Sequence, residues 1–194
     1  TIVLALKAAY FHAQHPDWRI AVTFNTRSLK GQFRRLINSF SIEQTGEEPD
    51  WEQLRIVNAW GASGGDDREG IYYEFCRTHG LQYFDFNSAQ NTFGRGKAFS
   101  GACDRAVAQA TTRKPLYDAL LVDEAQDLSK AQQELCLRMG HRIVMVGDDY
   151  QAIYAFAGAD SESFANMGLR LEKSDRGLLR LPLNITYRCG KAIV

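Results

Sequence analysis

The chain has 194 residues, a length that suits one domain with a single core of sheet and helices. Hydrophobic residues make up 45% and charged residues 24%, which excludes the disordered and fibrous classes and is typical of a globular protein. Lys plus Arg and Asp plus Glu both total 23, so the chain has no bulk positive field. A nucleic acid would therefore have to be held by a local groove.

The cysteines and the hydropathy pattern indicate the cellular compartment in which the protein is expected. The four cysteines are far apart and form no CxxC pair, and Cys76 with His79 lacks a second pair at zinc spacing. We expect reduced thiols in a cytoplasmic protein without a membrane partner. No apolar run approaches the roughly 20 residues that span a bilayer. The chain starts without Met inside an apolar pattern, so we expect a fragment.

The first third predicts helix, strand and helix. Apolar residues recur at helical spacing from Ile2 to Ala13 until His15-Pro16, residues 19–24 predict a strand, and a second helix is expected with a cap near Asn25 or Thr26. The pattern of residues 41–116 is weaker and is typical of an insertion. It predicts a strand at "LRIVNAW", a Gly-rich turn, and short helices around 70–79 and 98–111.

Residues 117–148 predict one βαβ unit. A strand over 117–122 precedes a helix over 129–139, for which Ser129 and Gln132 form a capping box, and a strand follows over 141–148. Strands joined in this way are parallel. Both strands are continuous apolar runs, which indicates an α/β fold with helices on both faces of the sheet.

Carboxylates follow both strands. Asp123, Glu124 and Asp127 come after the first, and Asp148-Asp149 after the second. Ligands of open α/β sheets bind beyond the carboxyl ends of the strands. An Asp-Glu pair there suits nucleotide chemistry, in which the Asp holds Mg²⁺ and the Glu takes a proton from water. A solvated turn is the alternative at this point.

The wider pattern resembles the UvrD/Rep-like superfamily 1 DNA helicases. "DEAQD" matches their motif II, DExQD, and "GDDYQAIYAFAGA" resembles motif III, GDxxQxIYxFRGA. "TFNTRSL" from Thr23 is similar to motif Ia, and "LNITYRC" is similar to motif IV with Thr186 in place of Asn. The resemblance covers most of residues 1–30 and 117–194.

This resemblance implies a RecA-like P-loop NTPase fold, with residues 1–194 as a partial N-terminal ATP-binding domain that is incomplete at its N-terminus. It implies ATP and Mg²⁺ as cofactors, with Glu124 as general base and Gln151 and Arg188 at the γ-phosphate. The implied nucleotide and metal residues are Thr1, Asp123, Gln126, Gln151 and Arg188, with Thr1 and Asp123 on the metal. The implied DNA contacts are Phe24, Asn25, Thr26, Tyr154 and Phe156, although core packing is the alternative for the three aromatic rings.

The sequence departs from the family pattern at two points, one in motif III and one in the phosphate-binding loop. Ala157 stands where motif III commonly has Arg, and no GxxxxGK[ST] loop is present, since Gly96-Lys97 is followed by Ala98. In the family that loop directly precedes the first helix, so Thr1 is expected to be its last residue. Motifs V and VI are also absent.

The expected activity is that of an ATP-dependent DNA helicase that moves on single-stranded DNA and separates duplexes at junctions, as in DNA repair. The alternative is a non-motor ATP-binding switch or nucleic-acid-binding module, and a third possibility is the helicase portion of a nuclease fusion.

Overall fold

Four parallel strands form the centre of the protein: β1 (Ile20–Phe24), β2 (Leu54–Asn58), β3 (Tyr117–Val122) and β4 (Gly140–Met145). The computed structural model describes residues 1–24, 29–62, 69–148, 166, 179 and 181–183. The strand order is β2-β1-β3-β4. In register, Val22 of β1 lies between Ile56 of β2 and Leu121 of β3. Because the strands are parallel, their carboxyl ends share one edge of the sheet.

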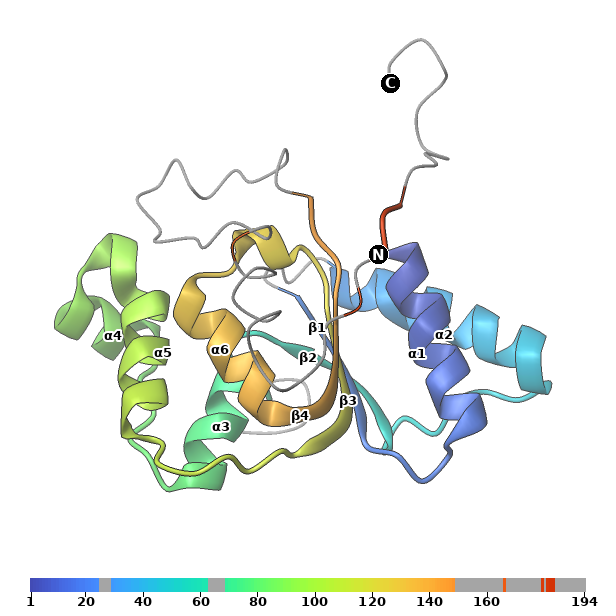
Figure 1. Cartoon of the computed structure of the whole chain (residues 1–194), viewed down its shortest axis with the longest axis horizontal. Coiled ribbons are helices and arrows are strands. Elements are labelled where there is room, and N and C mark those ends of the chain that lie inside the picture. The colour runs from blue at the N-terminus through green and yellow to red at the C-terminus, as the bar shows by residue number, and fades with distance from the viewer. Residues whose placement is uncertain (25–28, 63–68, 149–165, 167–178, 180, 184–194) are drawn as a thin grey trace, which may run out of the picture.

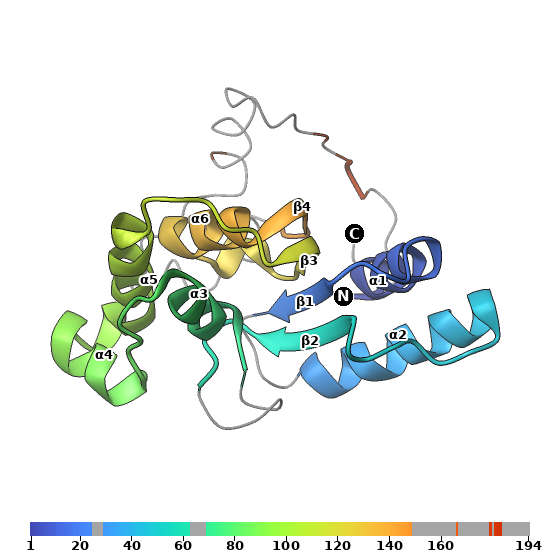
Figure 2. The same cartoon turned by 90° about the horizontal axis from the view of Figure 1, so that it is seen from below.

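Helices cover both faces of this sheet (Figures 1 and 2). Helices α1 (Ile2–Gln14) and α2 (Lys30–Thr45) pack together on one face. The other face is covered by α3 (Ile71–His79), α5 (Ala98–Gln109) and α6 (Lys130–Met139), and α4 (Phe86–Phe93) packs against α5. The prediction of an α/β fold with a parallel sheet between two helical layers is confirmed.

Side chains of β3 alternate between the two helical layers. Leu121 packs in the cluster that includes Leu4 of α1 and Phe33 of α2. Leu120 and Val122 pack in the cluster on the opposite face. All three are at most 1% exposed, because the strand is covered on both sides. This explains the continuous apolar run in the sequence.

The predicted βαβ unit is confirmed in its elements. Strand β3 has the predicted bounds, and α6 begins one residue after Ser129. Strand β4 pairs with β3 in parallel but ends at Met145, before the predicted end at 148. Both hydrogen bonds of the capping box are present. The Ser129 hydroxyl accepts from the Gln132 backbone nitrogen, and the Gln132 side chain accepts from the Ser129 backbone nitrogen.

The first two helices differ in detail from the prediction. Helix α1 buries Leu4, Ala5, Ala8 and Ala9. Ile2, Leu6 and Tyr10, which belong to the sequence pattern, are exposed. Helix α2 begins at Lys30, after an N-terminal residue, Leu29, whose side chain makes no cap. The cap predicted near Asn25 or Thr26 lies outside the described residues.

An ionic network attaches α3 to the sheet. Arg55 of β2 lies 2.9 Å from the fully buried carboxylate of Glu74 in α3, and it also pairs with Glu69. The hydroxyl of Tyr117, the first residue of β3, donates to Glu74. Burial raises the pKa of Tyr117 above its ordinary value. Residues between 41 and 116 thus supply a strand and a covering layer to the sheet, while their status as an insertion stays a prediction.

Within the described ranges, no helix combines the length and the apolar character that crossing a membrane requires.

Candidate functional site

The candidate site begins where β3 ends. Asp123 follows the last residue of the strand, is 1% exposed, and donates its backbone N–H to the Thr23 carbonyl at 3.0 Å. Its Oδ2 accepts a hydrogen bond of 2.7 Å from the Thr1 hydroxyl. Its Oδ1 lies 3.3 Å from the backbone nitrogen of Thr1. The start of α1 and the end of β3 are therefore side by side, although 122 residues separate them in sequence.

The Thr1 hydroxyl is directed to Asp123 instead of capping α1, where it makes no side-chain hydrogen bond. A hydroxyl and a carboxylate are the hard oxygen ligands that Mg²⁺ prefers. Among the residues described, no group of three or more His, Cys, Asp or Glu is placed to hold a metal. The pair fits Mg²⁺ bound by one carboxylate and completed by phosphate oxygens, which is the usual protein arrangement for this ion.

Glu124 adopts an unusual backbone conformation. Its φ of 51° and ψ of 46° place it in the left-handed region, where it is the single non-glycine residue of the described chain with positive φ. Such a conformation costs about 1–2 kcal/mol for a residue with a side chain. The chain then enters a 3₁₀ turn over Ala125–Asp127, in which the Asp127 N–H donates to the Glu124 carbonyl at 3.0 Å. Strained residues cluster at functional sites, so this geometry favours a functional role for the turn.

Gln126 connects Glu124 to the end of the next strand. Its side chain is 2% exposed. Its Nε2 donates to Glu124 Oε2 at 2.7 Å, and its Oε1 accepts from the Asp148 backbone N–H at 3.1 Å. The resemblance implies a nucleotide contact for Gln126, whereas both ends of its amide are used within the protein. The sequence pattern did not predict this bridge.

The backbones after β3 and β4 also approach each other closely. The Val146 N–H donates to the Val122 carbonyl and the Ala125 N–H to the Val146 carbonyl, both at 2.9 Å. A Cβ on Gly147 would lie 2.8 Å from Gln126 Oε1, closer than carbon and oxygen can pack. A side chain at 147 would therefore displace the Gln126 amide or move the two turns apart.

Phe24 lies in the core. Its side chain is 1% exposed, and its ring stacks on that of Phe33 with centroids 5.5 Å apart and an angle of 7° between the rings. Stacking with a base requires an open ring face. The DNA contact expected of Phe24 is corrected accordingly, since Phe24 is a packing residue of the α2 side of the sheet.

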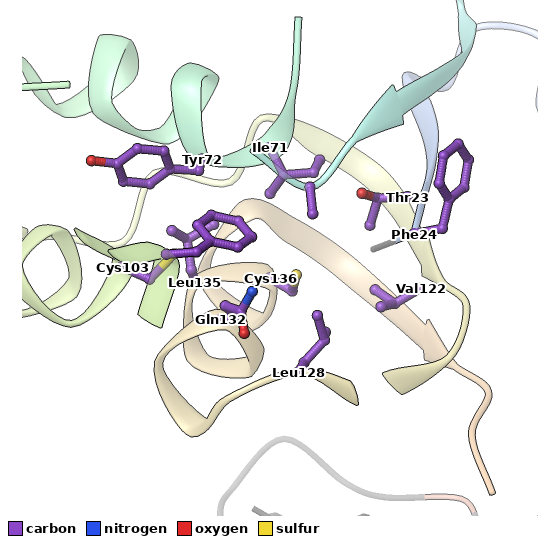
Figure 3. Close-up of a pocket in the computed structure, with 12 residues that line it drawn as sticks. Thr23, Phe24, Ile71, Tyr72, Cys103, Val122, Leu128, Gln132, Leu135 and Cys136 are labelled. Carbon is purple, nitrogen blue, oxygen red and sulfur yellow. The ribbon is translucent and has the colours of Figure 1, made fainter. Parts of the chain in front are cut away.

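A small cavity lies on the opposite face of the sheet, beside β1 and β3 (Figure 3). Thr23, Val122, Leu128 and Gln132 are among its lining residues. The volume open to the centre of a water molecule is about 10 Å³, close to the least that holds one water. This space is too small for a nucleotide. The candidate site rests instead on the carboxylates of Asp123 and Glu124 after β3.

The remaining predicted site residues lie outside the described residues. They are Asn25, Thr26, Gln151, Tyr154, Phe156 and Arg188, together with the substituted Ala157. Their roles stay predictions.

Comparison with known proteins gives one family. The model of the UvrD/REP helicase N-terminal domain matches residues 69–171, just over half of the chain. The exonuclease/helicase protein RexA of Lactococcus lactis subsp. cremoris is 44% identical over 168 residues, which are 84% of this chain and 12% of that protein. An ATP-dependent helicase/nuclease from another strain of the same subspecies is 28% identical over 168 residues, again 84% of this chain and 12% of the relative.

A eukaryotic relative matches a shorter stretch. The F-box DNA helicase protein 1 of Schizosaccharomyces pombe is 49% identical over 49 residues, which are 25% of this chain and 6% of the relative. Even where it aligns over most of its own length, the chain spans only 12% of the two Lactococcus proteins.

Proposed function

Because this chain belongs to the UvrD/REP helicase family, we propose that it is part of an ATP-dependent DNA helicase. The full-length protein would couple hydrolysis of Mg-ATP to movement along single-stranded DNA and to separation of duplexes at junctions. The observation that carries this proposal is the contact between Thr1 and Asp123 beside Glu124, because it joins the residues expected for metal binding and for proton transfer.

In this proposal each residue at the sheet edge has a separate task. Asp123 and Thr1 would hold Mg²⁺, which would supply positive charge to the phosphate oxygens of the nucleotide. Glu124 accepts a proton from the attacking water. The hydrogen bond from Gln126 to Oε2 restricts the orientation of the carboxylate and leaves lone pairs on its oxygens for the water. The buried carboxylate of Asp123 and the Thr1 hydroxyl that donates to it are two oxygen groups side by side, which supports a bound Mg²⁺ at this point.

The test uses the full-length protein. We expect ATP hydrolysis that requires Mg²⁺, increases with a single-stranded oligonucleotide, and drives displacement of a strand from a tailed duplex. Glu124→Gln should still bind Mg-ATP but lose on the order of 10²-fold or more in turnover, because a positioned base is removed. An unchanged turnover in this variant would refute the base assignment, and a wild-type protein without ATP hydrolysis would refute the proposal.

Two other results would change the assignment. Hydrolysis of ATP without strand displacement would favour a non-motor switch. A nuclease elsewhere in the full-length protein is a second candidate, because the names of the two Lactococcus relatives include this activity. Degradation of a labelled duplex in the same assay would reveal it.

A further inference from the structure

The amide of Gln126 is placed between two parts of the site that the sequence separates. On one side is the carboxylate of Glu124, 2.7 Å from Nε2. On the other side is the backbone N–H of Asp148, 3.1 Å from Oε1. Only a side chain with both a donor and an acceptor can make these two bonds at once, and an amide has both. The burial of Gln126 keeps water from replacing either partner.

Glu124 is the residue that the Gln126 amide would position. Its side chain is only half buried, and a glutamate in that position can adopt several rotamers. The left-handed backbone fixes where the side chain starts, and the bond from Gln126 fixes where one carboxylate oxygen lies. A general base must be placed within hydrogen-bond distance of the water that it deprotonates.

The Asp148 bond connects this carboxylate to a second motif. Asp148 directly precedes the segment whose sequence carries Gln151, Tyr154 and Phe156, the residues expected at the γ-phosphate and the DNA bases. Gly147 leaves just enough space for Gln126 Oε1. A shift of the 147–148 backbone would therefore act on Gln126 directly.

From these contacts we infer that Gln126 is a positioning residue, which holds the Glu124 carboxylate in place and links it to the backbone at Asp148, and that it is not a ligand of the nucleotide. This inference rests on the proposed function. Its consequence is that Gln126 acts on the chemical step and on its stimulation by DNA, and leaves nucleotide affinity unchanged.

Two substitutions in the full-length protein separate the two bonds. Gln126→Met keeps the length of the side chain and removes both bonds. Gln126→Glu keeps an acceptor for the Asp148 N–H but, when it is ionised, cannot donate to Glu124 and repels its carboxylate. Gln109→Met, at the exposed end of α5, is the matched control. ATP turnover with and without a single-stranded oligonucleotide gives kcat, KM and the stimulation by DNA.

We expect both Gln126 variants to lose roughly 10- to 100-fold in kcat, because a base misplaced by about 1 Å costs on the order of 10²-fold. Their KM for ATP should stay within about threefold of wild type, as when an interaction made only in the transition state is lost. The stimulation by DNA should fall in Gln126→Met and be retained better in Gln126→Glu. Gln109→Met should match wild type throughout. An increase in KM with unchanged kcat would identify Gln126 as a nucleotide ligand and overturn the inference, as would unchanged kinetics.

Hydrogen exchange at the Asp148 amide provides a readout that does not require turnover. We expect faster exchange in Gln126→Met and slow exchange in wild type and Gln126→Glu, since the acceptor remains in the latter. Equal exchange in wild type and Gln126→Met would show that the bridge is absent and overturn the inference. A wild-type protein with a protected Asp148 amide but no ATP hydrolysis would contradict the proposed function while leaving the bridge in place.

Discussion

Glu124 combines a strained backbone with the residue type that the proposed chemistry needs. Glycine enters the left-handed region without a steric cost, whereas this chain has glutamate at that position. The same 3₁₀ turn places Gln126 beneath it. At this scale the residue types of the site were predictable from "DEAQD", whereas the bridge was not, because it depends on how closely β4 approaches the turn.

The strain at Glu124 predicts opposite effects on stability and activity. Glu124→Gly and Glu124→Ala both remove the carboxylate and should both abolish ATP turnover. Glu124→Gly should be more stable than Glu124→Ala by about 1 kcal/mol, because only glycine escapes the cost of positive φ. The midpoints of urea unfolding of the two variants test this difference. Equal midpoints would show that the turn relaxes without cost.

A side chain added at position 147 is expected to lower the stability of the protein. Gly147→Ala should cost about 1–3 kcal/mol through overpacking, because its Cβ would meet Gln126 Oε1 at 2.8 Å and the Gln126 backbone nitrogen at 3.1 Å. Gly31→Ala is the control, since nothing lies within 4 Å of a Cβ in that first turn of α2. We expect Gly31→Ala to raise stability by about 0.5–1 kcal/mol. Denaturant unfolding measures both, and a neutral Gly147→Ala would show that the two turns can separate.

Among the elements, those with clear end signals were predicted best. Helix α6 has a capping box and β3 has an uninterrupted apolar run, and both agree with the structure. The buried face of α1 was not recognised, because apolar residues occur on all sides of that helix and the spacing read from the sequence includes the exposed Ile2, Leu6 and Tyr10. Helix α4 was missed because its sequence is short and polar. The cap at Asp85, which accepts from the Ser88 N–H at 2.7 Å, was the available signal.

The capping box of α6 predicts a measurable loss. Ser129→Ala removes the acceptor for the Gln132 backbone N–H and should lower the free energy of unfolding by about 1 kcal/mol. Ser39→Ala, on the exposed side of α2, is the matched control and should be neutral or slightly stabilising, because alanine favours helix. Urea unfolding of the two variants gives the comparison. A Ser129→Ala protein as stable as wild type would mean that the cap is dispensable.

On the scale of the whole molecule, the sheet separates two hydrophobic cores. The core on the side of α3, α5 and α6 contains three thiols. Cys76, Cys103 and Cys136 are free and buried. Burial raises the pKa of Cys76 to about 11 and that of Cys136 to about 12. It also raises the pKa of Cys103 well above its ordinary value. Since the thiolate is the reactive form, these cysteines should be inert in the folded protein.

This burial predicts both reactivity and pH dependence. At pH 8 an alkylating reagent should leave the three thiols unmodified in the native protein and modify all of them in urea, which peptide mapping by mass spectrometry can follow. Unfolded thiols lose protons near the ordinary pKa of 9.0, while the folded ones keep theirs. Stability should therefore be unaffected by these groups below about pH 9 and fall as pH rises toward 11–12. Native alkylation at the rate of a free thiol would contradict the packing of this core.

The alternation along β3 makes the site sensitive to chain length more than to residue identity. Leu120 and Leu121 face opposite layers, so exchanging one aliphatic side chain for another changes only local packing. Deleting a single residue from the strand would turn every following side chain to the other layer and draw Asp123 away from Thr1. Aliphatic exchanges within β3 should thus be tolerated, but an insertion or deletion of one codon there would remove the contact between Thr1 and Asp123, which is proposed to hold Mg²⁺, together with the fold that presents it.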